Sequence, residues 1–161
     1  MRRLYPLYSL VLALLVGGNV LYTFLATPVV FAHFERDLAG RVVAAMMPYY
    51  FRYDLALILV AAVLFRVAAE RRGDRAYWGS VALLSAGAVV ALAVVSWLYP
   101  AMVEVRAGVS SFAADAPVTE ARLAFRRLHG LSSALNLLLL GVGTALLLLA
   151  PTNAPAQTKS P

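Results

Sequence analysis

The sequence predicts an all-α integral membrane protein, an antiparallel four-helix bundle whose second and third helices are long. Residues 4–34 and 128–158 contain no Asp, Glu, Lys or Arg, and residues 76–103 form a third such stretch. A hydrocarbon core about 30 Å thick is crossed by about 20 apolar residues of helix. Of the 161 residues, 62% are hydrophobic and 14% are charged. Soluble domains are roughly 25% charged, so this chain is predicted to fold in lipid.

The first predicted span is retained rather than cleaved as a signal peptide, because its apolar run is too long for one. It ends at Thr27 and Pro28, since proline disfavours helical geometry in the residue before it. We place one transmembrane domain at residues 1–150, with spans at about 8–26, 38–70, 76–108 and 119–149, and a disordered polar tail at 151–161.

The second predicted helix is divided by charge in its middle. Apolar residues 42–51 and 55–65 are separated by Arg52-Tyr53-Asp54, and neither half is long enough to cross a bilayer alone. Either the first half lies along the interface, or Arg52 and Asp54 enter the membrane. The charged residues 70–75 then form a tight hairpin, which makes the second and third spans antiparallel neighbours.

The third and fourth predicted spans differ in character. The third is rich in small residues, among them Gly79, Ala82 and Gly87, which allow helices to approach closely in lipid. Asp115 or Thr119 can cap the fourth, and Pro151 is predicted to end it.

Charge and composition limit the function classes. The net charge is +6, but the arginines flank apolar runs, so lipid headgroups explain them better than nucleic acid. With no cysteine, thiolate metal sites, iron–sulfur clusters and cysteine nucleophiles are excluded. Basic residues divide evenly between the two sides. Arg2 and Arg3 before the first span favour both termini in the cytoplasm, in a bacterial inner membrane.

A stripe of polar residues marks the fourth span, recurring every three or four positions through His129, Ser132 and Asn136. Lipid cannot satisfy such groups, so the stripe must face the interior, where charged residues of the other spans gather at one end. The candidate polar site comprises Arg41, Arg52, Asp54, Glu104, Arg126, His129, Ser132, Asn136, Asn19 and Tyr22. Ion pairs of Glu104 with Arg41 or Arg126 are expected. The alternatives are hydrogen bonds that fix helix packing, or a solvated collar beyond the lipid.

Cofactor ligands are scarce. His33 and His129 are the two histidines, and they are weak candidates for haem iron, or for copper together with Met46, Met47 and Met102. The expectation is no cofactor and no catalytic residue, because the sequence holds no phosphate-binding glycine loop, zinc-protease motif or nucleophile elbow.

Several short motifs resemble one known family. They are Pro28-Val-Val-Phe31, Ala39-Gly40, Tyr99-Pro-Ala-Met102 and Phe125-Arg-Arg-Leu-His129-Gly-Leu-Ser132, followed by Asn136. In this order, over about residues 10–149, the chain resembles the transmembrane protein 205-like family of small four-span membrane proteins. The resemblance implies a fold and supplies no catalytic residues.

The function expected from these residues is non-enzymatic binding or passage of a small solute or metal ion at the polar mouth. In this interpretation the acids hold a cation and His129 supplies a neutral ligand. One alternative is a structural or accessory subunit, whose small-residue face docks on a membrane-protein partner or a second copy in the lipid bilayer. Another is a haem-binding redox protein.

Overall fold

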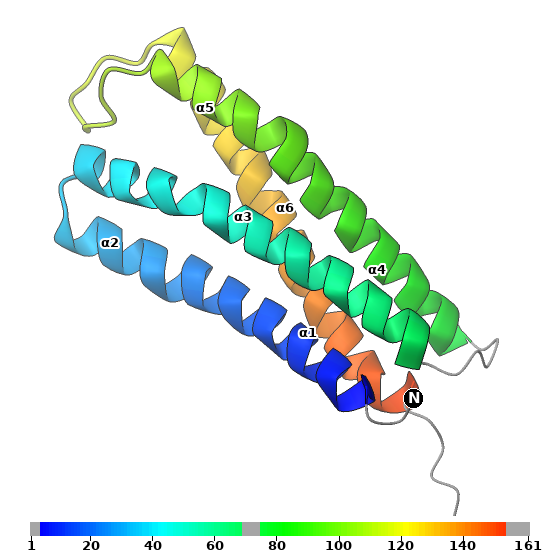
Figure 1. The fold of residues 1–161 in the computed structure, drawn as a ribbon. Coiled ribbons are helices and arrows are strands. Elements are labelled where there is room, and N and C mark those ends of the chain that lie inside the picture. The colour runs from blue at the N-terminus through cyan, green and yellow to red at the C-terminus, as the bar shows by residue number, and fades with distance from the viewer. Residues whose placement is uncertain (1–3, 69–74, 154–161) are drawn as a thin grey trace, which may run out of the picture.

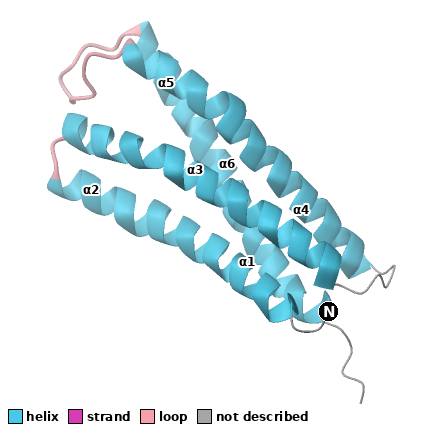
Figure 2. Ribbon diagram, viewed as in Figure 1, coloured by secondary structure: helices cyan, strands magenta, loops and turns pink. Residues whose placement is uncertain are grey.

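A computed structural model describes residues 4–68 and 75–153, with side chains described to residue 150. Every regular element in these ranges is a helix, so the all-α prediction is confirmed (Figure 2). The elements are α1 (Tyr5–Val20), η2 (Leu21–Ala26), α2 (Thr27–His33), α3 (Arg36–Ala68), α4 (Arg75–Ala93), η3 (Val94–Leu98), α5 (Tyr99–Ala107) and α6 (Glu120–Asn153). The predicted hairpin falls on residues 69–74, and Arg2, Arg3 and the tail from residue 154 also lie outside the described residues.

Three of these helical stretches are long and apolar enough to cross a membrane. They are Tyr5–His33, Arg75–Ala107 and Glu120–Ala150. The long helix α3 is not among them and carries Arg52 and Asp54 in its middle. It is nonetheless one continuous helix, in which Arg52 is exposed and Asp54 is buried.

Two prolines follow π-helical turns instead of ending helices. The first helix does not end at Thr27 and Pro28, where the sequence predicts its end, but continues to His33. In η2 the backbone N–H of Thr27 donates to Tyr22 O, five residues back, and Tyr99 donates to Val94 O in the same way before Pro100. The wider turn leaves room for the proline ring, which would otherwise collide with a carbonyl one turn earlier. Likewise, α6 runs to Asn153, past Pro151.

The helices pack differently at the two ends of the molecule. Toward the N-terminus, α1 contacts α3 and α6, and α4 also contacts α3 and α6, so each helix has two neighbours. Toward the loops at the other end, α2 packs with α3 and α5 packs with α6, as two pairs (Figure 1). We call these the closed half (residues 5–20, 54–68, 75–93 and 136–150) and the open half (residues 21–53 and 94–135).

The closed half holds the main apolar core. Tyr8, Leu12, Ile58, Phe65 and Leu146 are fully buried there. Glycines permit the close approach on which packing in lipid depends. A β carbon on Gly143 would lie 3.1 Å from Val16 Cγ2, and one on Gly87 would lie 3.2 Å from Ile58 Cδ1. The closed half therefore fixes the relative positions of the four helices.

Candidate functional site

A cavity of about 1140 Å³ lies in the open half, lined by residues of η2, α2, α3, α5, the α5–α6 loop and α6. Its walls are mainly apolar and aromatic, and include Met47, Phe51, Tyr99 and Met102. Pockets that bind small molecules typically measure about 300–1,000 Å³ and have such walls with a few polar groups. This cavity is large enough for an extended organic molecule.

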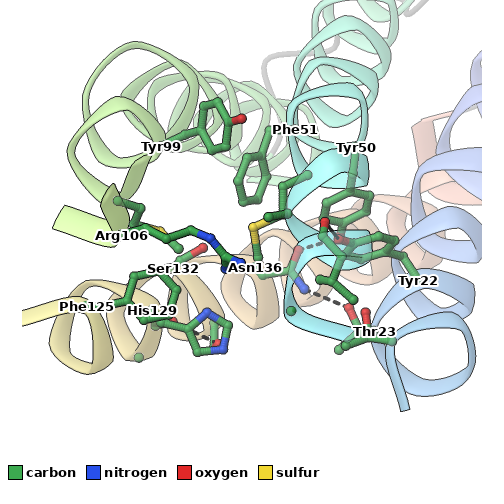
Figure 3. A pocket seen from close by; sticks show the side chains of 18 of the residues that line it. Tyr22, Thr23, Tyr50, Phe51, Tyr99, Arg106, Phe125, His129, Ser132 and Asn136 are labelled. Atoms are coloured by element: carbon green, nitrogen blue, oxygen red, sulfur yellow. Dashed lines mark hydrogen bonds between the residues drawn. The ribbon is translucent and has the colours of Figure 1, made fainter. Parts of the chain in front are cut away.

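Polar side chains from separate helices form the floor of the cavity (Figure 3). The Tyr50 hydroxyl lies 2.8 Å from Asn19 Oδ1 and 2.5 Å from Asn136 Oδ1, and Asn136 Nδ2 lies 2.8 Å from Thr23 Oγ1. One hydroxyl proton serves one acceptor, so Tyr50 donates to Asn19. Exchanging the amide O and N of Asn136 lets its nitrogen donate to Tyr50 and its oxygen accept from Thr23.

Asp54 lies beneath this floor, on the side of the closed half. Its side chain is 1% exposed, and its Oδ1 accepts a hydrogen bond of 2.9 Å from Asn19 Nδ2. Its other oxygen, Oδ2, has no hydrogen-bond partner among the described residues. A buried charge without a partner is costly, so the network around Asn19 is the principal support of this carboxyl group.

Stacked rings form the wall above the floor. The rings of Tyr22 and Tyr50 are 3.9 Å apart and nearly parallel, and Phe51 meets Tyr99 edge to face at 5.8 Å. These contacts join η2 to α3 and α3 to α5. Because Tyr50 contributes both its ring and its hydroxyl, it connects the apolar wall to the polar floor.

The mouth of the cavity is rich in arginine. Arg36, Arg106, Arg122 and Arg126 line it, and no Asp or Glu is among the described lining residues. The guanidinium of Arg122 is hydrogen-bonded to the α5–α6 loop, since it donates to Ala116 O at 2.6 Å and to Ala113 O at 3.0 Å. The mouth therefore carries positive charge without acidic side chains in its lining.

The loop is also attached to α3 through Asp37. The Asp37 carboxylate accepts hydrogen bonds from the Ser111 hydroxyl at 2.5 Å and from the Phe112 backbone N–H at 2.6 Å. These bonds lower the pKa of Asp37 below its ordinary value, and the nearby charges of Arg41 and Arg106 lower it further. We call this contact of Asp37, Ser111 and Phe112 the loop clasp.

The structure brings together most of the predicted polar site. Tyr22, Arg126, His129, Ser132 and Asn136 line the cavity, and Asn19 and Asp54 lie beneath its floor. In contrast, Arg41, Arg52 and Glu104 are exposed and do not line the cavity. Within the described residues Glu104 makes no ion pair with Arg41 or Arg126.

The two histidines contact different parts of the protein. His33 contacts its own helix, with Nδ1 2.9 Å from Val29 O, whereas His129 stacks on Phe125 at 5.9 Å. No group of three or more His, Asp or Glu side chains with metal-binding geometry occurs among the described residues. The haem and copper alternatives stay predictions.

Three polar residues on which this description depends are absent from the predicted candidate set: Thr23, Tyr50 and Arg106. Tyr50 could have been found, since it precedes Asp54 by one helical turn and so shares its face. Thr23 lies one turn after Asn19 in the same way. Arg106 is one of the charged residues that the sequence gathers at one end of the bundle, but its place in the cavity depends on how α5 packs against α6.

The family of this chain follows from residues 10–110. Over this range, from α1 to the α5–α6 loop, the chain matches the family model described as "Domain of unknown function (DUF4149)". The chain belongs to the DUF4149 family. No curated protein and no solved structure matches it. The DUF4149 match includes Asn19, Tyr50, Asp54 and Arg106 but stops before α6.

Proposed function

We propose that this DUF4149 protein is a multi-pass membrane protein that binds an organic molecule with a long apolar body in the cavity of the open half. The cavity is the observation that carries the proposal. A predominantly apolar wall would hold the body of such a molecule, and the few polar groups at floor and mouth would orient it. The protein acts here as a binding protein, without catalytic residues.

The proposal includes the membrane arrangement. It takes one antiparallel membrane crossing within each of the helical stretches 5–33, 36–68, 75–107 and 120–153, with Asp37 and the α5–α6 loop outside the membrane and both termini in the cytoplasm. Three of these stretches, at 5–33, 75–107 and 120–150, are long and apolar enough to cross a membrane, which supports three of the crossings. For α3, burial of Asp54 against α1 supports the fourth, because the carboxyl group then faces protein rather than lipid. The likeness to transmembrane protein 205-like proteins belongs to this proposal.

Native mass spectrometry of the protein in mild detergent tests the proposal, because it counts bound molecules directly. The probe is methyl palmitate, which has a long apolar chain and no charge. We expect a saturable complex of about one probe per protein, as one cavity implies. Ala44 lines the cavity, so Ala44→Trp is expected to weaken binding by about tenfold or more, equivalent to about 1.4 kcal/mol.

The matched control is Ala86→Trp on α4, since Ala86 is exposed and does not line the cavity. Binding that does not saturate, or that both tryptophan variants reduce equally, would overturn the proposal. Elemental analysis of the same preparation tests the expectation that no metal or haem is bound.

A further inference from the structure

We propose that Arg106 anchors the acidic headgroup of the molecule bound in the cavity, which makes that molecule an anionic amphiphile with a carboxylate or phosphate group. This inference rests on the proposed function and names its ligand class. It starts from the position of one guanidinium group in a largely apolar space.

Arg106 extends from α5 into the cavity, toward Ser132 of α6 and above His129 (Figure 3). Two rings flank the guanidinium: its carbon lies 5.4 Å from the centre of the Phe112 ring and 6.0 Å from that of Phe125. On the α3 side, the guanidinium lies beside Gly40, where a β carbon would be at an ordinary contact distance of 3.6 Å from Arg106 Nη2. The side chain is thus held in place mainly by apolar and aromatic surfaces.

The hydrogen-bonding capacity of this guanidinium is unused by the protein. It carries five N–H donors in a planar fork. Among the described residues it makes no ion pair and donates no hydrogen bond. Asp37 is near enough to interact with it through space, but the carboxylate of Asp37 accepts its hydrogen bonds from the loop clasp. The positive charge of Arg106 therefore lies in the cavity without a hydrogen-bonded acid among the described residues.

An anionic group is the ligand that this arrangement fits. Guanidinium groups bind carboxylate and phosphate through two parallel hydrogen bonds, and such bonds are stronger where water is excluded. Arg36 and Arg126 add positive charge to the same lining, and the lining has no described acid to oppose it. A cation, which the predicted mouth of acids would have held, is disfavoured here because Glu104 points elsewhere and Asp54 lies beneath the floor.

The rest of the cavity indicates that the anion carries an apolar chain. Met47, Phe51, Tyr99 and Met102 line the same cavity as the arginines and pack as part of one apolar cluster. Methionine side chains adapt to ligands of irregular shape. A small inorganic ion would leave this wall unused, whereas an acyl or alkyl chain would cover it.

The experiment compares methyl palmitate with palmitate and hexadecyl phosphate, by native mass spectrometry at a pH where both acids are ionised. We expect both anions to bind the unaltered protein about tenfold or more tightly than the ester does, equivalent to about 1.4 kcal/mol, because charge-assisted hydrogen bonds are stronger than neutral ones. In Arg106→Gln this preference for the anions should be lost while binding of the ester is kept. Arg106→Lys keeps the charge without the fork and should give an intermediate preference.

Arg127→Gln is the matched control, because Arg127 is exposed on α6 and does not line the cavity. Unchanged preference for the anions in Arg106→Gln overturns the inference, as does equal binding of ester and anions by the unaltered protein. Both results leave the proposed function standing, whereas absence of ester binding removes the proposed function itself. Inorganic phosphate is the last arm: if it binds as tightly as hexadecyl phosphate, the ligand is a free anion and the amphiphile is refuted.

Discussion

Asn19 is the residue on which the buried polar network depends most. Its side chain is fully buried, its Nδ2 donates to Asp54 at 2.9 Å, and its Oδ1 accepts from Tyr50 at 2.8 Å. Asn19→Leu removes both bonds between helices and keeps the branched shape of the side chain. Within membranes such bonds contribute on average about 0.6 kcal/mol and at most about 1.7 kcal/mol each. Two of them give an expected loss of about 1–3 kcal/mol in the free energy of unfolding.

Most of this loss in the free energy of unfolding should come from the buried Asp54 carboxyl group, because Asn19 no longer hydrogen-bonds to it. Without Asn19, Asp54 loses the hydrogen bond to Oδ1, and Oδ2 has no hydrogen-bond partner among the described residues of the intact protein. Replacing both members of a buried polar pair by apolar residues is often nearly neutral, whereas removing one is not. The double variant Asn19→Leu, Asp54→Leu is therefore expected to recover about 1–3 kcal/mol relative to Asn19→Leu alone.

The assay is equilibrium unfolding of the purified protein in mixed micelles with increasing SDS. Thr144→Val is the control, since the exposed Thr144 hydroxyl donates to Leu140 O within α6. Losses that simply add in the double variant would refute the reasoning, because they would show that Asp54 does not depend on Asn19.

Two other parts of the fold give further predictions. Gly143→Leu should lower the free energy of unfolding by about 1–3 kcal/mol by overpacking α1 against α6, whereas Gly141→Leu should be tolerated because nothing lies within 4 Å of its β-carbon position. The same SDS titration measures both variants, and equal losses would contradict the packing argument. For the loop clasp, the lowered pKa of Asp37 means that the attachment is fully present above the ordinary carboxyl pKa and is lost as the pH falls through the lowered value. The chain has no cysteine, so a spin label on Ala114→Cys reports loop mobility at one site; Asp37→Ala should raise that mobility at neutral pH, and Asp115→Ala should not.

The sequence pattern was sufficient to predict the helices, but it did not predict that they separate into two pairs in the open half. Long uncharged stretches specify helices in lipid, and the spacing of Ser132 and Asn136 places them on one inward face, where both line the cavity. The prediction that the first helix ends at Pro28 was wrong. The π-helical turn before it accommodates a proline that lacks a backbone N–H, and such turns have no strong local sequence signature.

The sequence also did not predict which charged side chains face the cavity. Positions along neighbouring helices put Glu104, Arg41 and Arg126 at similar heights, yet height alone does not give the rotation of a helix about its axis. In the structure Glu104 and Arg41 are exposed, whereas Arg106, two residues after Glu104, reaches the cavity. Packing of α5 against α6 decides which side of α5 faces inward, and no local pattern in the sequence specifies that packing.

The two π-helical turns lie at the boundary between the closed and open halves, one in each of the helical stretches 5–33 and 75–107. Each is a point where the regular backbone ladder is interrupted, so bending there changes the separation of the helix pairs and leaves the core around Ile58 and Phe65 intact. The main apolar core and the cavity thus lie largely in different parts of one small chain. Substitutions of cavity-lining residues within 21–53 and 94–135 can therefore reshape the cavity without a compensating change in the core around Ile58 and Phe65.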